Sequence, residues 1–270
     1  MKEVMITGAS KGIGKALAKE FLNYGYNIIL VARNVEELNK TKNELQKEYS
    51  KSSIKTEAMD LILKENLHEL VTKYPDIDIL VNNAAMVKLG HSFHIENEEQ
   101  MRGIKLNVET PCFLSNFYIK KMLEKNDNKN FLGIINVSSV AGLFAHPLTN
   151  YYSPSKYFLD QYSCNLWYEL KRKFKTKNIN VMSLCPGAVR TDFTGENKFL
   201  KMKKSCDKFK FLNLYLEPDY VAKAAVKDFF KNKKRSVPGK FYKLSKLIIK
   251  FLPERLIAKV VYDGIEREIE

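Results

Sequence analysis

Short apolar runs alternate with longer amphipathic stretches along the first three quarters of the chain. The runs have the length of buried strands, and the stretches repeat apolar residues every three to four positions, as helices packed on one side do. The expected strands are Val4–Thr7, Ile28–Ala32, Ile54–Met59, Ile77–Asn82, Gly133–Ser138 and Val181–Leu184. The expected helices are Ile13–Tyr24, Val35–Tyr49, Glu98–Leu123 and Tyr151–Phe174.

This order of strands and helices predicts an α/β fold. Strands that read as continuous apolar runs are typical of parallel sheets covered on both faces, and their crossovers are right-handed. We therefore expect a Rossmann-type, doubly wound parallel sheet of about seven strands, with helices on both faces. No internal repeat or low-complexity linker interrupts the 270 residues, so one domain is predicted over 1–270.

The pattern changes after Arg190. A helix is predicted at Pro218–Phe230, since proline is tolerated in a first helical turn, and Arg235–Gly239 is a candidate last strand. Over 240–270 apolar residues recur at helical spacing with lysines between them. Such a basic amphipathic extension either packs on the core or rests on a membrane surface, and packing is the outcome we expect.

Composition excludes several classes of protein. Hydrophobic residues make up 45% and charged residues 28% of the chain, which are globular rather than disordered values. The cysteines form no CxxC pair and stand near no histidine cluster, so neither a metal site nor a disulfide framework is expected. The chain starts without a secretory signal and has no run long enough to span a membrane. We therefore expect a cytoplasmic protein, with any membrane contact peripheral.

The net charge of +14 lies mostly after Gly195. No helix-turn-helix, zinc-finger or RRM signature accompanies it, so nucleic acid is not an expected partner. Attraction to anionic amphiphiles or to a membrane surface would also explain this charge, and a solvated lysine-rich surface is the simplest explanation.

A glycine-rich loop follows the first strand and opens the first helix. Glycines permit a tight turn and let the backbone approach a pyrophosphate, which lies at the positive helix N-terminus. The loop is not a magnesium-binding Walker loop, because Ala16 follows Gly14-Lys15 and offers no hydroxyl. The candidate cofactor residues of this loop are Gly8, Ser10, Lys11, Gly12, Ile13 and Gly14.

The end of the second strand indicates which dinucleotide binds. Folds that bind NAD place an acidic residue about 20 positions past the loop, whereas this chain has Arg33 there. A guanidinium can hold a 2′-phosphate by two hydrogen bonds, and Lys11 can add a second positive charge. The pattern predicts NADP(H), although both could be ordinary surface cations.

Tyr152 and Lys156 are four residues apart at the start of a predicted helix, so they share one face. A free tyrosine has a pKa near 10, and a nearby ammonium group favours the phenolate and brings that pKa toward neutrality. Ser139, at the end of a strand, offers a hydroxyl to a substrate carbonyl. Ser138 is an alternative, but the thirteen-residue spacing to Tyr152 favours Ser139.

Taken together, these motifs resemble the short-chain dehydrogenase/reductase family over about residues 3–194. The resemblance rests on the glycine loop, Asp60-Leu61, Asn82-Asn83-Ala84-Ala85, Asn107, Ser139, Tyr152-xxx-Lys156 and Pro186-Gly187-Ala188-Val189-Arg190-Thr191 in family order. It implies an NADP(H)-dependent oxidoreductase that interconverts a ketone and a secondary alcohol. Ala85 departs from the family, which usually has glycine there.

The resemblance also implies roles for single residues. Tyr152 would be the proton donor, Ser139 would orient the carbonyl, Lys156 would bind the nicotinamide ribose, and Asn107 would hold a water in a proton relay. The cofactor would further contact Asp60, Leu61, Asn83, Ala84, Ala85, Pro186, Gly187, Val189 and Thr191. Alternatives stay open: Asn107 could bond backbone groups within its helix, and Asp60 and Thr191 could be helix N-caps. His91, His94 and His146 are expected to be loop residues.

The family resemblance also implies a class of substrate and an oligomeric state. The segment 192–216 would form a lid, and its phenylalanines and lysines would suit a hydrophobic substrate that carries an acid, such as a bile-acid-like steroid or a 3-oxoacyl thioester. Val237-Pro238-Gly239 with Leu252-Pro253-Glu254-Arg255-Leu256 resembles a subgroup of hydroxysteroid dehydrogenases and long-chain 3-oxoacyl reductases, some membrane-associated. A homodimer or homotetramer through Glu98–Leu123 and Tyr151–Phe174 is expected; a non-catalytic NADPH-binding regulator is the less favoured alternative.

Overall fold

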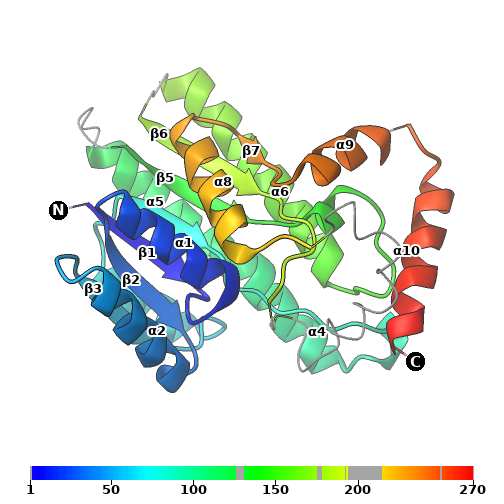
Figure 1. The fold of residues 1–270 in the computed structure, drawn as a ribbon, viewed down its shortest axis with the longest axis horizontal. Coiled ribbons are helices and arrows are strands. Elements are labelled where there is room, and N and C mark those ends of the chain that lie inside the picture. The colour runs from blue at the N-terminus through cyan, green and yellow to red at the C-terminus, as the bar shows by residue number, and fades with distance from the viewer. Residues whose placement is uncertain are drawn as a thin grey trace.

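The computed structural model describes residues 2–125, 131–174, 178–191, 193, 215–249 and 251–269. Its strands form one parallel sheet in the order β3-β2-β1-β4-β5-β6-β7 (Figure 1). The strands are β1 Glu3–Thr7, β2 Asn27–Ala32, β3 Ile54–Ala58, β4 Ile79–Asn82, β5 Leu132–Val137, β6 Ile179–Leu184 and β7 Arg235–Ser236. The predicted doubly wound parallel sheet is confirmed.

Helices cover both faces of the sheet because the strand side chains alternate between two apolar cores. Val4 and Ile6 of β1 belong to one core and Met5 to the other. The first core is completed by α1 Gly12–Asn23, α2 Val35–Glu48 and α8 Pro218–Phe230. The second is completed by α3 Lys64–Lys73, α5 Thr110–Lys125 and α6 Tyr152–Glu169. The carboxyl ends of the strands therefore open at one edge between these two layers.

The predicted helix at Glu98–Leu123 is interrupted. It begins as α4 Asn97–Ile104, passes through the π-helical turn Lys105–Glu109, and continues as α5. Pro111 has no N–H for the Asn107 carbonyl, and the Thr110 N–H reaches back five residues to Lys105. The helix predicted to reach Phe174 likewise ends in a π-helical turn, Leu170–Phe174. Helix α3, which has only three buried residues in a charged sequence, was not predicted.

The C-terminal extension forms α9 Lys240–Ile249 and α10 Glu254–Ile269, at the end of the molecule away from β3 (Figure 1). Strand β7 stops at Ser236 rather than Gly239, since Pro238 lacks a backbone donor and Gly239 has a φ of 89°. The expectation that this extension packs on the core holds for the buried Tyr242 and is wrong for Leu244 and Leu247, which are exposed. Of the predicted lid, residues 192 and 194–214 lie outside the described residues.

Candidate active site

The glycine loop between β1 and α1 is held in one conformation. Gly8 and Gly12 have φ values of 63° and 57°, a left-handed region that glycine adopts without strain. A Cβ on Gly14 would lie 2.3 Å from the Gly8 carbonyl oxygen, so the helix can approach the loop only without a side chain there. The Asn83 amide donates hydrogen bonds to the Thr7 and Gly8 carbonyls, both at 2.9 Å. Asn83 therefore fixes the loop from the end of β4.

A cavity of about 800 Å³ runs from this loop along the carboxyl ends of the strands. It gathers nearly all the residues that the sequence singled out. Those that line it are Gly8, Ser10, Lys11, Gly12, Ile13, Arg33, Asp60, Leu61, Asn83, Ala84, Ala85, Ser139, Tyr152, Lys156, Pro186, Gly187, Val189 and Thr191. Gly14 and Asn107 are not among its lining residues. Gly14 packs against the backbone of the glycine loop, and Asn107 is hydrogen-bonded to Met86.

Positive charge gathers at the loop end of the cavity. The Arg33 side chain is exposed there, and no ion pair involving it occurs among the described residues. Lys11 lies 3.5 Å from one carboxylate oxygen of Glu37, and the other oxygen accepts a hydrogen bond from the Ser10 hydroxyl at 3.2 Å. Arg33 is therefore available to an anionic group, whereas Lys11 shares its charge with Glu37.

Asp60 does not act as the N-cap of α3, because that position belongs to Leu63. Its carboxylate instead accepts a hydrogen bond from the Ile62 N–H at 3.2 Å and lies 3.5 Å from the Arg102 guanidinium. These contacts hold Asp60 and Leu61 at the cavity wall beside the end of β3.

Tyr152, Ser139 and Lys156 converge at the other end of the cavity. The Ser139 hydroxyl lies near the Tyr152 hydroxyl and acts to lower the pKa of Tyr152, and it accepts a hydrogen bond from the Ala141 N–H at 3.1 Å. The Lys156 ammonium lies 5.6 Å from the centre of the Tyr152 ring and donates to the Val137 carbonyl at 2.7 Å. Ser138 donates to the Lys156 carbonyl at 2.6 Å, which uses its hydroxyl to anchor α6. The geometry therefore favours Ser139 over Ser138 as the hydroxyl that faces Tyr152.

Burial is the main influence on the pKa values of Tyr152 and Lys156. It raises the pKa of Tyr152 to about 12, and the nearby Ser139 hydroxyl opposes this increase. It lowers the pKa of Lys156 to about 7, because a buried ammonium loses its hydration. The structure thus differs from the expectation that Lys156 lowers the tyrosine pKa: desolvation outweighs an ammonium that points at the Val137 carbonyl.

Asn107 joins two segments behind the cavity wall. Its amide nitrogen donates to the Met86 carbonyl at 2.9 Å and to the Ser155 hydroxyl at 3.1 Å, and its oxygen accepts from the Met86 N–H at 2.9 Å. The side chain does bond backbone groups, but across to Met86 rather than within its own helix. Its part in a proton relay stays a prediction.

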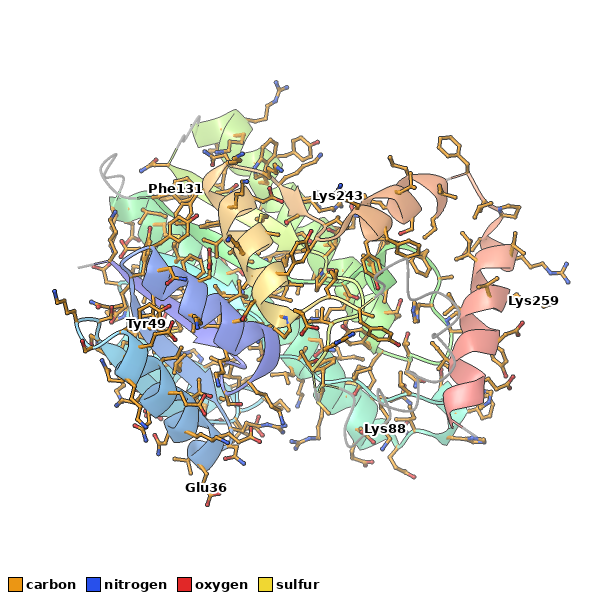
Figure 2. All side chains as sticks on the ribbon, viewed as in Figure 1. Glu36, Tyr49, Lys88, Phe131, Lys243 and Lys259 are labelled. Atoms are coloured by element: carbon orange, nitrogen blue, oxygen red, sulfur yellow. The ribbon has the colours of Figure 1, made fainter. Side chains whose placement is uncertain are left out.

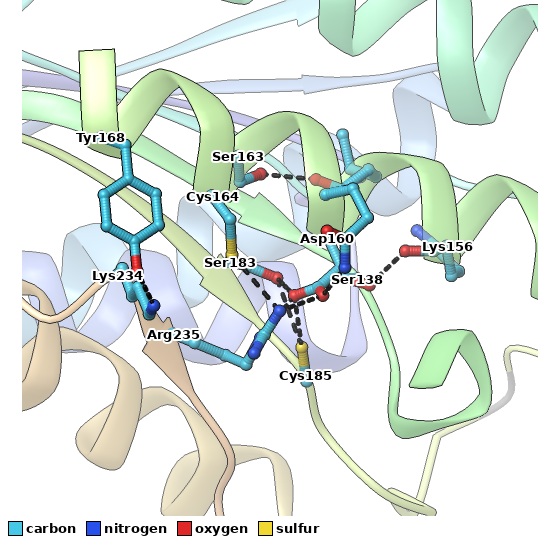
Figure 3. Close-up of polar contacts among 12 residues, drawn as sticks. Ser138, Lys156, Asp160, Ser163, Cys164, Tyr168, Ser183, Cys185, Lys234 and Arg235 are labelled. Atoms are coloured by element: carbon cyan, nitrogen blue, oxygen red, sulfur yellow. Dashed lines mark hydrogen bonds and ion pairs between the residues drawn. The ribbon is translucent and has the colours of Figure 1, made fainter. Parts of the chain in front are cut away.

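A buried ion pair one turn beyond Lys156 was missed by the sequence analysis (Figure 3). Asp160 is fully buried and receives both branches of the Arg235 guanidinium, with Nε at 2.7 Å. It also accepts from the Ser183 hydroxyl at 2.6 Å and from the Cys185 thiol at 3.4 Å. This network joins α6 to β7 and to the end of β6, immediately before Pro186. The continuation of the four-residue spacing from Tyr152 and Lys156 to Asp160 was the available signal.

The wall beyond Tyr152 is mainly apolar. Val87, Leu89, Phe193 and Ile265 line it, together with His146. Burial lowers the pKa of His146 to about 4, so this imidazole is neutral at physiological pH. Ile265 comes from α10, which means that the C-terminal extension supplies part of the wall, a role that the sequence analysis did not assign.

Helix α9 is fastened to the segment Pro186–Val189. The Tyr242 hydroxyl accepts a hydrogen bond from the Ala188 N–H at 2.9 Å. Its ring lies so close to Gly187 that a Cβ there would be 2.0 Å away. Gly187 is therefore required as glycine by a contact from the C-terminal extension.

Comparison with known proteins agrees with this geometry. The family model for short chain dehydrogenase matches residues 2–199. The 3-oxoacyl-[acyl-carrier-protein] reductase of Rickettsia felis is 32% identical over 193 residues, 72% of this chain and 75% of the relative. The NADPH-dependent 3-dehydrocapnine reductase of Ornithobacterium rhinotracheale is 25% identical over 285 residues, 99% of this chain and 98% of the relative.

Solved structures share the fold. A 7beta-hydroxysteroid dehydrogenase superposes with a TM-score of 0.84 at 19% identity, covering 96% of each chain. A short-chain dehydrogenase from Sphingobium yanoikuyae, in complex with NADPH, superposes with a TM-score of 0.72 at 24% identity, covering 88% of this chain and 87% of that one. With the family model matching most of its length and the cavity where the fold requires it, this chain belongs to the short-chain dehydrogenase family of oxidoreductases.

Proposed function

We propose that this protein reduces a ketone to a secondary alcohol with NADPH, reversibly, on a hydrophobic substrate that carries an anionic group. One observation carries the proposal. A single cavity is lined by the glycine loop and the exposed Arg33 and also by Ser139, Tyr152 and Lys156.

The cavity fits a phosphorylated dinucleotide. Gly8 and Gly12, which have no side chain, would let a pyrophosphate approach the backbone at the N-terminus of α1. Arg33, with Lys11 beside it, would hold a 2′-phosphate, and the wall of Asp60, Leu61 and Asn83–Ala85 would hold the adenosine. Pro186, Gly187, Val189 and Thr191 would line the nicotinamide, and Lys156 its ribose.

The residues at the far end supply the acid–base chemistry. Bound NADPH would supply the hydride. Tyr152 would donate its proton to the carbonyl oxygen of the substrate, and the Ser139 hydroxyl would hold that oxygen by a hydrogen bond. The Lys156 ammonium would stabilise the phenolate left on Tyr152, and Asn107 would support the path by which the proton is replaced.

We expect the rate of reduction to fall as the pH rises through about 7. Burial holds the pKa of Lys156 near 7, so its ammonium is present below that pH and lost above it. Tyr152, with its pKa near 12, remains protonated throughout, so the change would belong to Lys156. The measurement is kcat/KM for reduction against pH, with Lys171→Met as a control on a lysine outside the cavity. A flat profile through pH 7 would contradict this assignment.

Two substrate classes fit the apolar wall. A bile-acid-like hydroxysteroid and a 3-oxoacyl thioester both have an apolar body that suits the apolar side chains of Phe193 and Ile265. The match to 3-dehydrocapnine reductase favours the second class, because it extends through α9 and α10. The matches to 3-oxoacyl reductases support the same chemistry.

Purified protein should oxidise NADPH in the presence of one of these classes. The panel comprises ketosteroid acids, their methyl esters, 3-oxoacyl thioesters and simple ketones, followed by cofactor absorbance. Turnover with simple ketones alone, or equal kcat/KM for acids and esters, would contradict the anionic amphiphile. Absence of turnover with bound NADPH would favour a non-catalytic regulator.

Arg33→Ala should raise the KM for NADPH by about 10- to 100-fold and change that for NADH little. A lost charge-assisted hydrogen bond costs about 1.5–3 kcal/mol, and 1.4 kcal/mol corresponds to tenfold. Arg172→Ala removes an exposed arginine outside the cavity and is the matched control. If NADH is the better donor for the unaltered protein, the assignment of Arg33 and Lys11 to a phosphate is wrong.

We also propose an oligomeric state and a cellular location for this protein. Tyr157, Phe158 and Tyr168 leave a broad apolar area on the outer side of α6, which supports a homodimer or homotetramer through α6 and the α4–α5 segment. Among the helices that the structure describes, none combines the length and apolar character needed to cross a bilayer. We propose a cytoplasmic protein whose membrane contact, if made, is peripheral.

A further inference from the structure

The exposed apolar residues of the described chain are concentrated in the C-terminal extension. Eight of them fall within residues 241–260: Phe241, Leu244, Leu247, Ile248, Phe251, Leu252, Leu256 and Val260. Leu244 and Leu247 are 58% and 57% exposed, and Phe251 is 87% exposed. Isolated apolar residues on a surface are ordinary, but a contiguous cluster marks a contact surface.

Four of these residues share one side of α9. Phe241, Leu244, Leu247 and Ile248 lie three or four positions from one another along the helix, so they project from one side of it; we call this the α9 face. The exposed Phe251 follows in the turn after the helix. The opposite side holds Tyr242, which is buried against Gly187 and bonded to Ala188. Because Tyr242 fixes the rotation of the helix, the α9 face is turned away from the core.

The positive charge of α9 favours an anionic partner. Lys240, Lys243 and Lys246 are its charged residues, and no acidic residue occurs within Lys240–Ile249. A second copy of α9 packed against the first by two-fold symmetry would bring Lys240 and Lys243 of the two copies together, and the only carboxylate between Lys240 and Leu256 is Glu254, which stands next to Arg255. An anionic lipid surface offers both an apolar layer for the leucines and phenylalanines and negative headgroups for the exposed Lys240 and Lys243.

We propose that the α9 face docks in the plane of an anionic lipid bilayer, with Leu252 and Leu256 at the start of α10 extending the contact. Figure 2 places Lys243 on α9 and Lys259 on α10, at the end of the molecule away from β3. Leu256 shares helix α10 with Ile265, which lines the active-site cavity, so the extended contact reaches the helix that forms part of the substrate wall.

The full-length protein should sediment with phosphatidylcholine vesicles that contain phosphatidylglycerol, and much less with vesicles of phosphatidylcholine alone. Leu244→Ser with Leu247→Ser should weaken binding by about tenfold or more, since each leucine loses apolar burial. Lys240→Gln with Lys243→Gln should weaken it by about fivefold per lysine, and added salt should act in the same direction. All four side chains are exposed, so thermal unfolding should be unchanged.

The matched control is Val35→Ser with Leu63→Ser, two residues of similar exposure on another part of the surface. Vesicle binding that is absent, indifferent to phosphatidylglycerol, or weakened equally by the control would overturn the proposal. So would a protein that is dimeric by light scattering and becomes monomeric on Leu244→Ser with Leu247→Ser, without binding vesicles, since a second copy would then cover the face. Vesicle binding is measured without substrate or cofactor, so its outcome is independent of the reductase activity.

Discussion

Replacing Tyr152 with phenylalanine should lower kcat for ketone reduction by about 10²- to 10⁴-fold, the usual contribution of a positioned general acid. The hydroxyl is the group that the structure places against Ser139, and the ring would remain to fill the same space. Steady-state rates with NADPH and the best substrate of the panel measure the effect. Binding of NADPH, followed by its fluorescence, should persist.

Tyr151→Phe is the matched control for this substitution. Tyr151 is the preceding residue and is also buried, but its hydroxyl has no hydrogen-bond partner among the described residues. Removing that hydroxyl should leave the rate almost unchanged. If Tyr152→Phe retained the rate of the unaltered protein, the proton would come from another group and the proposed chemistry would fail.

Replacing Arg235 with methionine should lower the free energy of unfolding by about 3–5 kcal/mol. The substitution leaves the fully buried Asp160 carboxylate with the Ser183 hydroxyl and the Cys185 thiol but without a countercharge. Removing the charge as well, in Asp160→Asn with Arg235→Met, should recover much of the loss, because no buried ion is then uncompensated. Urea unfolding followed by circular dichroism measures each variant.

Arg190→Met provides the comparison at the surface. Arg190 pairs with Glu217 at 3.1 Å, and both side chains are about 60% exposed, so its loss should cost less than about 1 kcal/mol. A single Arg235 variant as stable as the double variant would show that the Asp160 carboxylate is tolerated without its partner.

The sheet and the loop were predictable because their signals are local. Gly8, Gly12 and Gly14 lie within seven residues and combine with the strand before them and the helix after them. Tyr152 and Lys156 share a helix face by spacing alone. Ser139 was preferred to Ser138 by spacing, and the structure supplies the physical reason, since the Ser138 hydroxyl is used by the Lys156 carbonyl.

The sequence analysis missed features that depend on burial or on contacts between residues far apart in the chain. Asp160 and Arg235 are 75 residues apart, and although the spacing from Lys156 marks Asp160, no local pattern pairs it with Arg235. Ile265 reaches the cavity only because α10 turns back toward it. The proton affinities of Tyr152 and Lys156 also differ from expectation, because spacing identifies a neighbour and says nothing of the water that both groups lose.

Tyr242 connects the exposed helix α9 with the border of the active-site cavity. One side chain connects a helix whose outer face is open to the surroundings with the Gly187–Ala188 backbone that borders the reaction cavity. If a shift of α9 were passed through Tyr242 to that backbone and changed the affinity for NADPH, thermodynamic linkage would make the influence mutual. If membrane docking of α9 raised the affinity for NADPH, bound NADPH would raise the affinity of the protein for the membrane by the same factor.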